Sequence, residues 1–477
     1  MLIRRLARWL DSRLGAARFA RTALNKVFPD HWSFMIGEIA LYCLVILILT
    51  GVYLTFFFVP DSREVVYHGS YAPLRGAHMS AAYQSTLRVS FDVRAGLVMR
   101  QIHHWAALIF IGSIIVHMVR IFFTGAFRRP RELNWAVGVT LLLLALANGF
   151  TGYSLPDDQL SGTGLRIAYS VLESVPFLGP WMAFLVFGGE FPSDDIISRL
   201  FTIHVLIVPA LIVGLLSVHL GLLVRQKHTQ FRGRGRTERN VVGSKLWPTF
   251  TAKTLGLFFF VFAVCAALGG LAQINPVWLY GPFKAQAVSS GSQPDWYIGW
   301  LEGALRLMPP WELRVAGFEI PNPFFPGVLL PGVTFAVIYA WPWIEQRFTK
   351  DRAEHHLLDR PRDRPVRTGL GVAVLTFYVV LFVAGGDDVI ASHFNLSVND
   401  VVYVFRGLVF VLPAVAYYVT YRLCKELSAR ARLPADELAL LARTPEGGYV
   451  EVEPGVEEPG VDEPGVDEED EELSPSS

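Results

Sequence analysis

The sequence predicts an all-α fold, a polytopic membrane bundle of about eight transmembrane helices with a four-helix core, and three observations support this prediction. Of the 477 residues, 52% are hydrophobic and 18% are charged, a composition too apolar for an ordinary soluble protein. Eight apolar segments are long enough to cross a hydrocarbon core. The second and fourth of these segments each contain two histidines, and the four residues are His103, His117, His204 and His219.

The apolar segments set the order of the expected elements. Their bounds are 35–58, 98–124, 135–155, 200–225, 252–273, 326–344, 368–386 and 402–424. We expect residues 31–230 to form the four-helix bundle and residues 231–425 to supply the C-terminal helices with a long outer loop. Residues 1–30 precede them as a basic segment, with seven Arg and Lys against two Asp. Residues 426–477 repeat Glu-Pro-Gly-Val in an acidic context, which predicts a disordered tail.

Basic residues indicate the orientation of the chain in a cell membrane. They gather in the loops after the second, fourth and sixth apolar segments. Since cytoplasmic loops carry an excess of Lys and Arg, these loops and both termini are predicted to be cytoplasmic. Both histidine segments then run from the outer to the inner face. This topology pairs the leading histidines, His103 and His204, near the outer face and the trailing pair near the inner face.

The spacing of the histidines predicts their chemistry. An α-helix turns about 100° per residue, so the 14-residue step from His103 to His117 returns to within roughly 40° of the same face. The 15-residue step in the fourth segment returns to within roughly 60°. The imidazoles of one helix then lie roughly 21 to 22 Å apart. Because a porphyrin held by one histidine from each of two helices is a six-coordinate electron carrier, we expect two b-type haems in the core.

Two other observations narrow the ligand set. His104 is rotated by roughly 140° from His117, so we expect that it is not a ligand. Each of the three cysteines falls in an apolar segment without a Cys-x-x-Cys pattern: Cys43, Cys265 and Cys424. This placement argues against disulfides, zinc and covalently attached haem.

Glycines and arginines accompany the histidines. Two glycine pairs repeat the 14-residue step, Gly37 with Gly51 in the first segment and Gly138 with Gly152 in the third. Glycine at these depths would let a flat macrocycle approach the helix, although plain helix packing explains such glycines equally well. Three arginines near the histidines are candidate partners of haem propionates or interfacial anchors: Arg100, Arg120 and Arg199.

From these residues and further motifs, the chain is identified as similar to cytochrome b, the haem-bearing subunit of respiratory cytochrome bc complexes, over roughly 30–425. The further motifs are Gly152-Tyr153-Ser154-Leu155-Pro156 and Pro294-Asp295-Trp296-Tyr297, which corresponds to the family's Pro-Glu-Trp-Tyr motif. The longer second histidine spacing, Asp295 and the additional C-terminal helices resemble the actinobacterial branch that oxidises menaquinol.

The resemblance implies an enzyme subunit, a quinol:cytochrome c oxidoreductase. Quinol oxidised at an outer site gives one electron to a Rieske iron–sulfur protein, and the other passes through the two haems to an inner quinone site, coupled to proton translocation. The implied partners are a Rieske subunit, a cytochrome c-type subunit, a second copy of this chain and membrane lipid. A terminal oxidase in a supercomplex is a further partner that the resemblance leaves open.

The resemblance also implies roles for single residues. Asp295 is the candidate proton acceptor at the outer site, Tyr297 a hydrogen-bonding partner, and Trp296 a residue lining a cofactor site. Glu302 places a second carboxylate nearby, although either acid would otherwise be read as an ordinary solvated loop residue. At the inner site Lys253 matches a family lysine, but Thr254 replaces the family aspartate, so the usual carboxylate is missing there.

Three alternative functions are compatible with intramembrane histidines. A di-haem anchor of a quinone-linked dehydrogenase fits the histidines but not the length or the Pro294–Tyr297 motif. A transporter could use histidines to bind metal or relay protons, and it would be colourless. A purely structural scaffold for other subunits would not require four buried histidines. The basic runs follow membrane topology and give no support for nucleic-acid binding.

Overall fold

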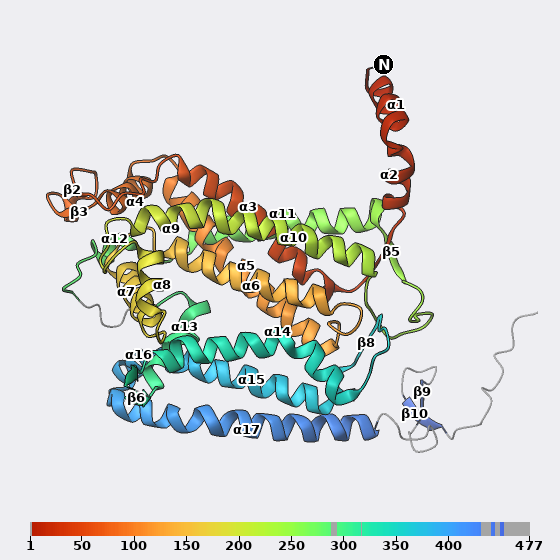
Figure 1. Cartoon of the computed structure of the whole chain (residues 1–477). Coiled ribbons are helices and arrows are strands. Elements are labelled where there is room, and N and C mark those ends of the chain that lie inside the picture. Colours follow the sequence, from red (N-terminus) through yellow and green to blue (C-terminus); the bar gives the residue numbers. More distant parts are fainter. Residues whose placement is uncertain (1, 288–292, 316, 431–439, 444–448, 453–477) are drawn as a thin grey trace, which may run out of the picture.

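A computed structural model describes residues 2–287, 293–315, 317–430, 440–443 and 449–452. Within these residues, eight helices are long and apolar enough to cross a membrane, which confirms the predicted fold class (Figure 1). The main helices of these spans are α3 (Ile36–Thr55), α5 (Gly96–Thr124), α6 (Glu132–Tyr153), α10 (Val208–Gln226), α11 (Thr251–Leu271), α14 (Leu330–Thr349), α15 (Pro365–Ala384) and α17 (Val398–Arg430).

Short helical turns extend several of these helices. The fourth span begins at Ile196, four residues before the predicted start, because α9 (Ile196–Thr202) continues through the π-turn η3 (Ile203–Ile207) into α10. Turns of the same type, η4 (Leu246–Phe250) and η5 (Phe325–Leu329), precede α11 and α14. The remaining short turns are η1 (Trp32–Phe34), η2 (Ala72–Leu74) and η6 (Pro361–Asp363).

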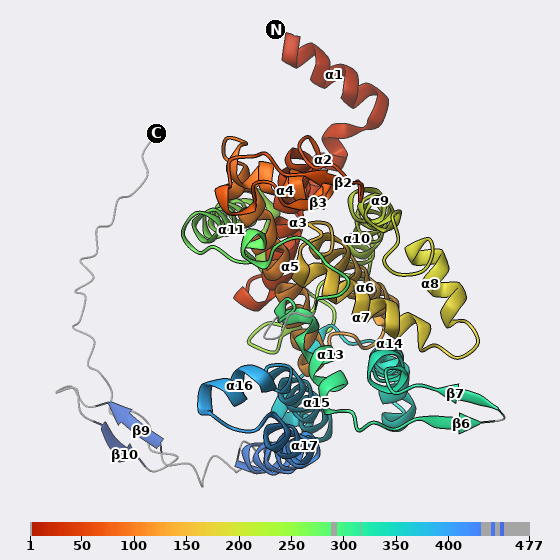
Figure 2. The same ribbon diagram turned by 90° about the vertical axis from the view of Figure 1, so that its left-hand side faces the viewer.

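The other helices lie outside the spans. Two precede the bundle, α1 (Leu2–Leu14) and α2 (Ala16–Leu24), and they project away from it across the direction of the spanning helices (Figures 1 and 2). The others gather at the opposite end of the bundle: α4 (Ala81–Phe91), α7 (Gln159–Glu173), α8 (Gly179–Phe187), α12 (Val277–Tyr280), α13 (Trp296–Leu307) and α16 (Asp387–Phe394). The Asp158 carboxylate caps α7 by accepting from the N–H groups of Leu160 and Ser161.

Strands occur only as small pairs within the described residues. β1 (Val27–Pro29) pairs with β5 (Gly243–Lys245), β2 (Glu64–Val66) with β3 (His78–Ser80), and β6 (Leu313–Val315) with β7 (Phe318–Ile320), all antiparallel. β4 (Gln230–Phe231) runs parallel to β8 (Leu357–Leu358).

The C-terminal region differs in part from the predicted disordered tail. Helix α17 continues to Arg430, beyond the expected limit at 425. β9 (Leu440–Arg443) pairs with β10 (Tyr449–Val452) inside the segment expected to lack structure. The acidic repeat after residue 452 lies outside the described residues.

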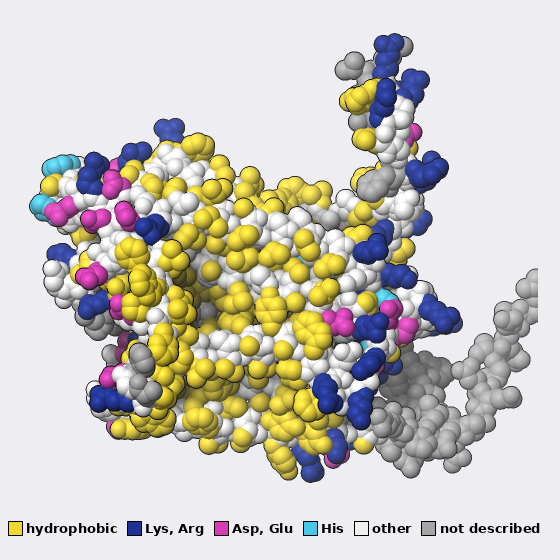
Figure 3. Space-filling model, viewed as in Figure 1, with side chains coloured by type: hydrophobic (Ala, Val, Ile, Leu, Met, Phe, Trp, Pro, Cys, Tyr) yellow, Lys and Arg dark blue, Asp and Glu magenta, His cyan; other side chains and the backbone are white. Residues whose placement is uncertain are grey.

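The connections that the sequence assigns to the cytoplasm do lie together at one end of the bundle, which we call the basic end. There Arg131 donates to the carbonyl oxygens of His355, Gln226 and Lys227 and thereby joins three connections. Lys26 reaches the Val224 carbonyl at 3.3 Å, which adds the N-terminal segment. Hydrophobic side chains cover the flank between the two ends, as expected for a surface facing lipid (Figure 3).

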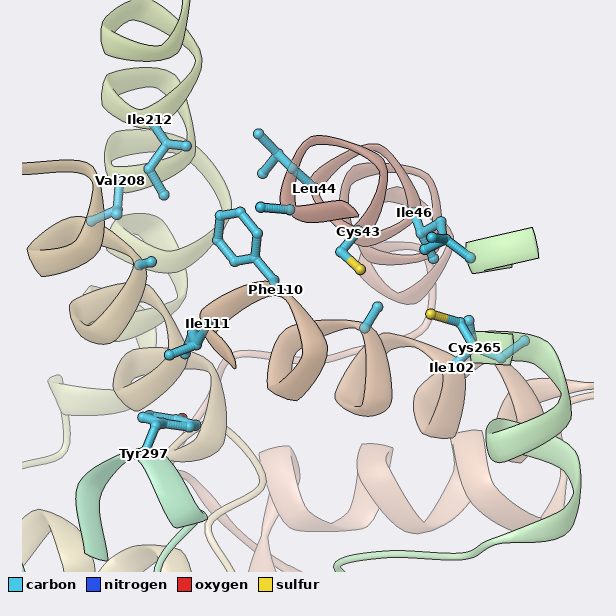
Figure 4. Packing of buried hydrophobic residues seen from close by; sticks show 14 residues of the cluster. Cys43, Leu44, Ile46, Ile102, Phe110, Ile111, Val208, Ile212, Cys265 and Tyr297 are labelled. Carbon is cyan, nitrogen blue, oxygen red and sulfur yellow. The ribbon is translucent and has the colours of Figure 1, made fainter. Parts of the chain in front are cut away.

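The spanning helices form two groups. Helices α14, α15 and α17 lie side by side in one group (Figures 1 and 2). A buried apolar cluster joins α3, α5, α6, α10 and α11, so α11 packs with the four-helix bundle and not with the other C-terminal helices. Within this cluster the thiols of Cys43 on α3 and Cys265 on α11 face each other (Figure 4).

Candidate functional site

The four histidines lie on two helices that face each other inside the bundle. His103 and His117 are on α5, His204 is in the π-turn η3, and His219 is on α10. The ring centroids of His103 and His204 are 6.3 Å apart. Two bonds of about 2.0 Å from histidine nitrogens to a metal, plus two ring radii, give about the same span. The predicted leading pair therefore fits one iron atom between two imidazoles.

Each of the four predicted glycines lies against one of the four histidines. A Cβ atom added to Gly51 would lie 3.2 Å from Cε1 of His103, and one added to Gly37 would lie 3.1 Å from Cε1 of His117. Glycines of α6 likewise lie against the other two histidines. A Cβ atom added to Gly152 would lie 2.3 Å from Cε1 of His204, and one added to Gly138 would lie 3.7 Å from Cε1 of His219. Gly37, Gly51 and Gly152 thus make room for the imidazoles themselves, whereas a Cβ at Gly138 would lie at ordinary contact distance.

Hydrogen bonds orient the leading pair. The Nδ1 atom of His103 lies 2.9 Å from the hydroxyl of Thr50, and that hydroxyl donates to the Ile46 carbonyl. The Nδ1 atom of His204 lies 2.9 Å from the Asn148 carbonyl oxygen. With the protons on Nδ1, both Nε2 atoms keep a lone pair for a metal. The donor set, two neutral imidazoles, suits haem iron.

Two of the three predicted arginines lie near the histidines with unpaired nitrogen atoms. Arg100 donates to the Asn275 carbonyl at 2.9 Å, while its buried Nε has no hydrogen-bond partner in the described chain. Arg120 lies over the ring of Phe34 at 4.4 Å, and its buried Nε and Nη2 also lack partners there. These orphaned donors fit the carboxylates of haem propionates.

One large cavity opens beside the leading pair at the end opposite the basic end. Its volume is about 760 Å³, within the usual range for sites that take organic ligands. His103, His204 and the two glycines against them line one part of it, and Asp295 and Tyr297 line another. A ligand in this cavity would therefore lie between the histidine pair and a carboxylate.

The carboxylate of Asp295 interacts with the side chains of His104 and Tyr297. His104 Nε2 lies 3.0 Å from each of its two oxygens, and both side chains are largely buried. Burial, followed by the charge of Asp295, raises the pKa of Tyr297 well above its usual value. The Tyr297 hydroxyl consequently stays protonated at neutral pH and remains a hydrogen-bond donor.

Three of the residues predicted near the outer histidine pair or the outer quinol site do not line the cavity. Arg199 donates to the Leu185 carbonyl and pairs with Asp195, so it points away from the histidines. The ring of Trp296 packs against Gly112 of α5. Glu302 lies two turns along α13, about 10 Å along the helix axis from Asp295, and forms an ion pair with Arg306.

Three residues at the cavity were given no site role from the sequence. His104 and Tyr153 line it, and Thr50 lies within hydrogen-bonding distance of His103, which also lines it. One signal was present, since Thr50-Gly51 and Thr151-Gly152 repeat the same dipeptide in two segments. In both copies the threonine hydroxyl lies within 3.4 Å of Nδ1 of a histidine of the leading pair.

The fold and the site together define the class, a multi-pass membrane protein with a histidine pair that suits haem iron. A family model described as cytochrome b(N-terminal)/b6/petB matches residues 108–282. The cytochrome bc1 complex cytochrome b subunit of Streptomyces coelicolor is 51% identical over 451 residues, covering 94% of this chain and 83% of that protein. The subunit of the same name from Mycobacterium tuberculosis is 49% identical over 455 residues, covering 94% and 83%.

The chain belongs to the cytochrome b subunits of cytochrome bc1 complexes. This confirms the resemblance drawn from the motifs, including its actinobacterial character, and the prediction of an oxidoreductase subunit. A solved structure titled "Hyperthermophilic respiratory Complex III" shares the fold, with a TM-score of 0.64 at 20% identity over 87% of this chain and 99% of that chain.

Proposed function

We propose that this chain is the di-haem subunit that oxidises quinol in the large cavity and passes electrons toward a second quinone site at the basic end. One observation carries the proposal, namely that a single cavity of about 760 Å³ is lined by both the His103/His204 pair and Asp295. A quinol bound there would reach an electron acceptor and a proton acceptor together. When bound between the paired histidines, two b haems supply one-electron transfer along the bundle.

Different residues of the cavity have different roles in quinol oxidation. Conversion of a quinol to a quinone releases two electrons and two protons. Asp295 accepts a proton from a quinol hydroxyl, while the His104 N–H keeps its carboxylate in one orientation. Tyr297 donates a hydrogen bond from its protonated hydroxyl. His103 and His204 would hold the outer haem, and His117 and His219 the inner one. The unpaired nitrogens of Arg100 and Arg120 would bind the propionates.

The acceptors and partners follow the family. One electron from each quinol goes to a Rieske iron–sulfur subunit, and the other crosses the bundle to reduce quinone. A cytochrome c-type subunit and a second copy of this chain complete the complex, and menaquinol is the substrate that the motif resemblance implies. The basic end, with both termini, faces the cytoplasm. Quinol protons are then released outside, which stores energy across the membrane.

The test is an optical one on the purified complex. Haem is quantified per polypeptide, and the reduced-minus-oxidised spectrum is recorded after addition of a menaquinol analogue. Two non-covalent b-type haems that the quinol reduces would support the proposal. A protein that is colourless after native purification, or haems that the quinol leaves oxidised, would refute it.

A further inference from the structure

A carboxylate lies inside the membrane span of α3. Glu38 is in the first turn of this helix and is only partly exposed. Ionisable side chains within spans are expensive and usually functional. No ion pair reaches Glu38 from the described residues, so charge neutralisation by a neighbouring cation does not explain its presence.

Two hydroxyls hold one oxygen of this carboxylate. Tyr42, one turn further along α3, donates to Oε2 at 3.2 Å. Thr254 of α11 donates to the same oxygen, and its hydroxyl also lies close to that of Tyr42. Within the described chain no hydrogen bond reaches Oε1. The carboxyl group is therefore held in place with one oxygen left for a ligand.

The position of Glu38 connects the inner histidine pair with the basic end. Its neighbour Gly37 packs against the His117 imidazole. On the other side, Lys253 adjoins Thr254 and forms a partly exposed ion pair with Asp30 at 2.6 Å. Glu38 thus lies between a cofactor ligand and polar residues that water can reach.

The surroundings suit a quinone ring. Tyr42 meets Phe258 of α11 edge to face, with the ring centroids 5.4 Å apart. These aromatic side chains lie where α3 packs against α11, next to the Thr254 hydroxyl. An aromatic wall with few polar groups is typical of sites for apolar organic ligands.

We propose that Glu38 is the carboxyl group that delivers a proton to quinone at the inner site, with Tyr42 and Thr254 as positioning residues. This inference rests on the proposed function. It also accounts for the missing carboxylate at position 254, because Thr254 reaches a carboxyl group supplied by the neighbouring helix. Compared with the family pattern, the carboxyl group is therefore supplied by α3 instead of α11, but it occupies the same region of the site.

The proposed step balances as follows. A quinone becomes a quinol by taking two electrons and two protons, which form an O–H bond at each carbonyl oxygen. The electrons arrive one at a time from quinol oxidised at the outer cavity. Glu38 transfers its proton to one carbonyl oxygen, is left as a carboxylate, and is reprotonated from water at the basic end. The proton for the second carbonyl oxygen also comes from this water.

The experiment compares two rates in the intact complex. In Glu38→Gln, quinol should still reduce the b haems at the unaltered rate, but their reoxidation by quinone should slow at least about tenfold. The matched control is Glu132→Gln, which removes a carboxylate from the first turn of another spanning helix at the same end and should change neither rate. Adding Thr254→Asp to Glu38→Gln returns a carboxylate to the site and should restore reoxidation.

A second readout does not depend on turnover. In the infrared difference spectrum between oxidised and reduced complexes, the unaltered protein should show a carboxyl band that disappears in Glu38→Gln. An unchanged reoxidation rate in Glu38→Gln would overturn the proposal and leave the proposed function standing. If that variant fails to assemble, Thr254→Val replaces it, and an unchanged rate there has the same meaning. Absence of quinol-driven haem reduction in the unaltered complex would instead refute the proposed function.

Discussion

The imidazole of His104 hydrogen-bonds the carboxylate of Asp295, with Nε2 at 3.0 Å from both oxygens. The side chains are 14% and 16% exposed, so little water competes for this contact. Two adjacent histidines of α5 therefore have different partners. His103 faces another histidine, whereas His104 turns to the loop before α13 and holds the candidate proton acceptor.

Replacing His104 by Ala should leave both haems in place and slow quinol oxidation about tenfold, because Asp295 loses the group that orients it. The haem content per chain and the rate of quinol-driven haem reduction measure these two effects. Loss of a haem would mean that His104 takes part in ligation.

Replacing Asp295 by Asn should slow quinol oxidation about 100-fold or more, since an amide cannot accept the quinol proton. Asn retains the size of the side chain and its ability to bond to His104, so the haem spectrum should not change. A quinol oxidation rate equal to that of the unaltered complex would remove Asp295 from the proton path.

Replacing His103 or His204 by Ala should abolish the outer haem and spare the inner one, because each iron needs both imidazoles. The haem-to-polypeptide ratio should fall by half, and only one component of the b-type α-band should remain. Retention of both haems in either variant would refute the pairing of these two histidines.

Gly152 and Gly138 offer a matched test of the space beside the histidines. A Cβ at Gly152 would lie 2.3 Å from Cε1 of His204, far inside contact distance, whereas one at Gly138 would lie 3.7 Å from His219. Gly152→Ala should displace His204 and weaken or abolish outer-haem binding, while Gly138→Ala should be tolerated. Equal haem retention in the two variants would show that the ring of His204 moves freely.

His228 predicts a pH dependence of stability. It is 9% exposed, beyond the end of α10, and burial together with the charges of Lys26 and Arg131 lowers its pKa from 6.5 to about 4. Because His228 binds a proton more readily in the unfolded chain, the neutral side chain contributes fully to the free energy of unfolding above about pH 6.5. This contribution is lost as the pH falls toward 4. The free energy of unfolding falls by on the order of 3 kcal/mol.

Thermal unfolding in detergent between pH 4 and pH 7.5 tests this expectation. His228→Gln should lose less stability on acidification than the unaltered chain. Parallel pH profiles for the two proteins would show that His228 does not titrate on unfolding.

Much of the site was accessible from the sequence because it depends on helix geometry. In a regular helix, residues about four turns apart lie on nearly the same face. The pairing of His103 with His204 could therefore be predicted from their spacing and from the number of spans. Arg199, Trp296 and Glu302 do not line the cavity, although they are close in sequence to residues that do. The neighbour that each of these side chains contacts depends on how its helix packs, which the sequence does not show.

The sequence by itself determined the membrane bundle, the number of spans, the two histidine pairs and the family, because hydrophobic length and helical period are local properties of the chain. Only the tertiary structure decided that His104 holds Asp295 and that Glu38 reaches Thr254. These contacts join residues 191 and 216 positions apart, on elements whose relative rotation follows from packing of the whole bundle. A side chain's own helix fixes the direction in which it points, but its partner is set by the neighbouring helix.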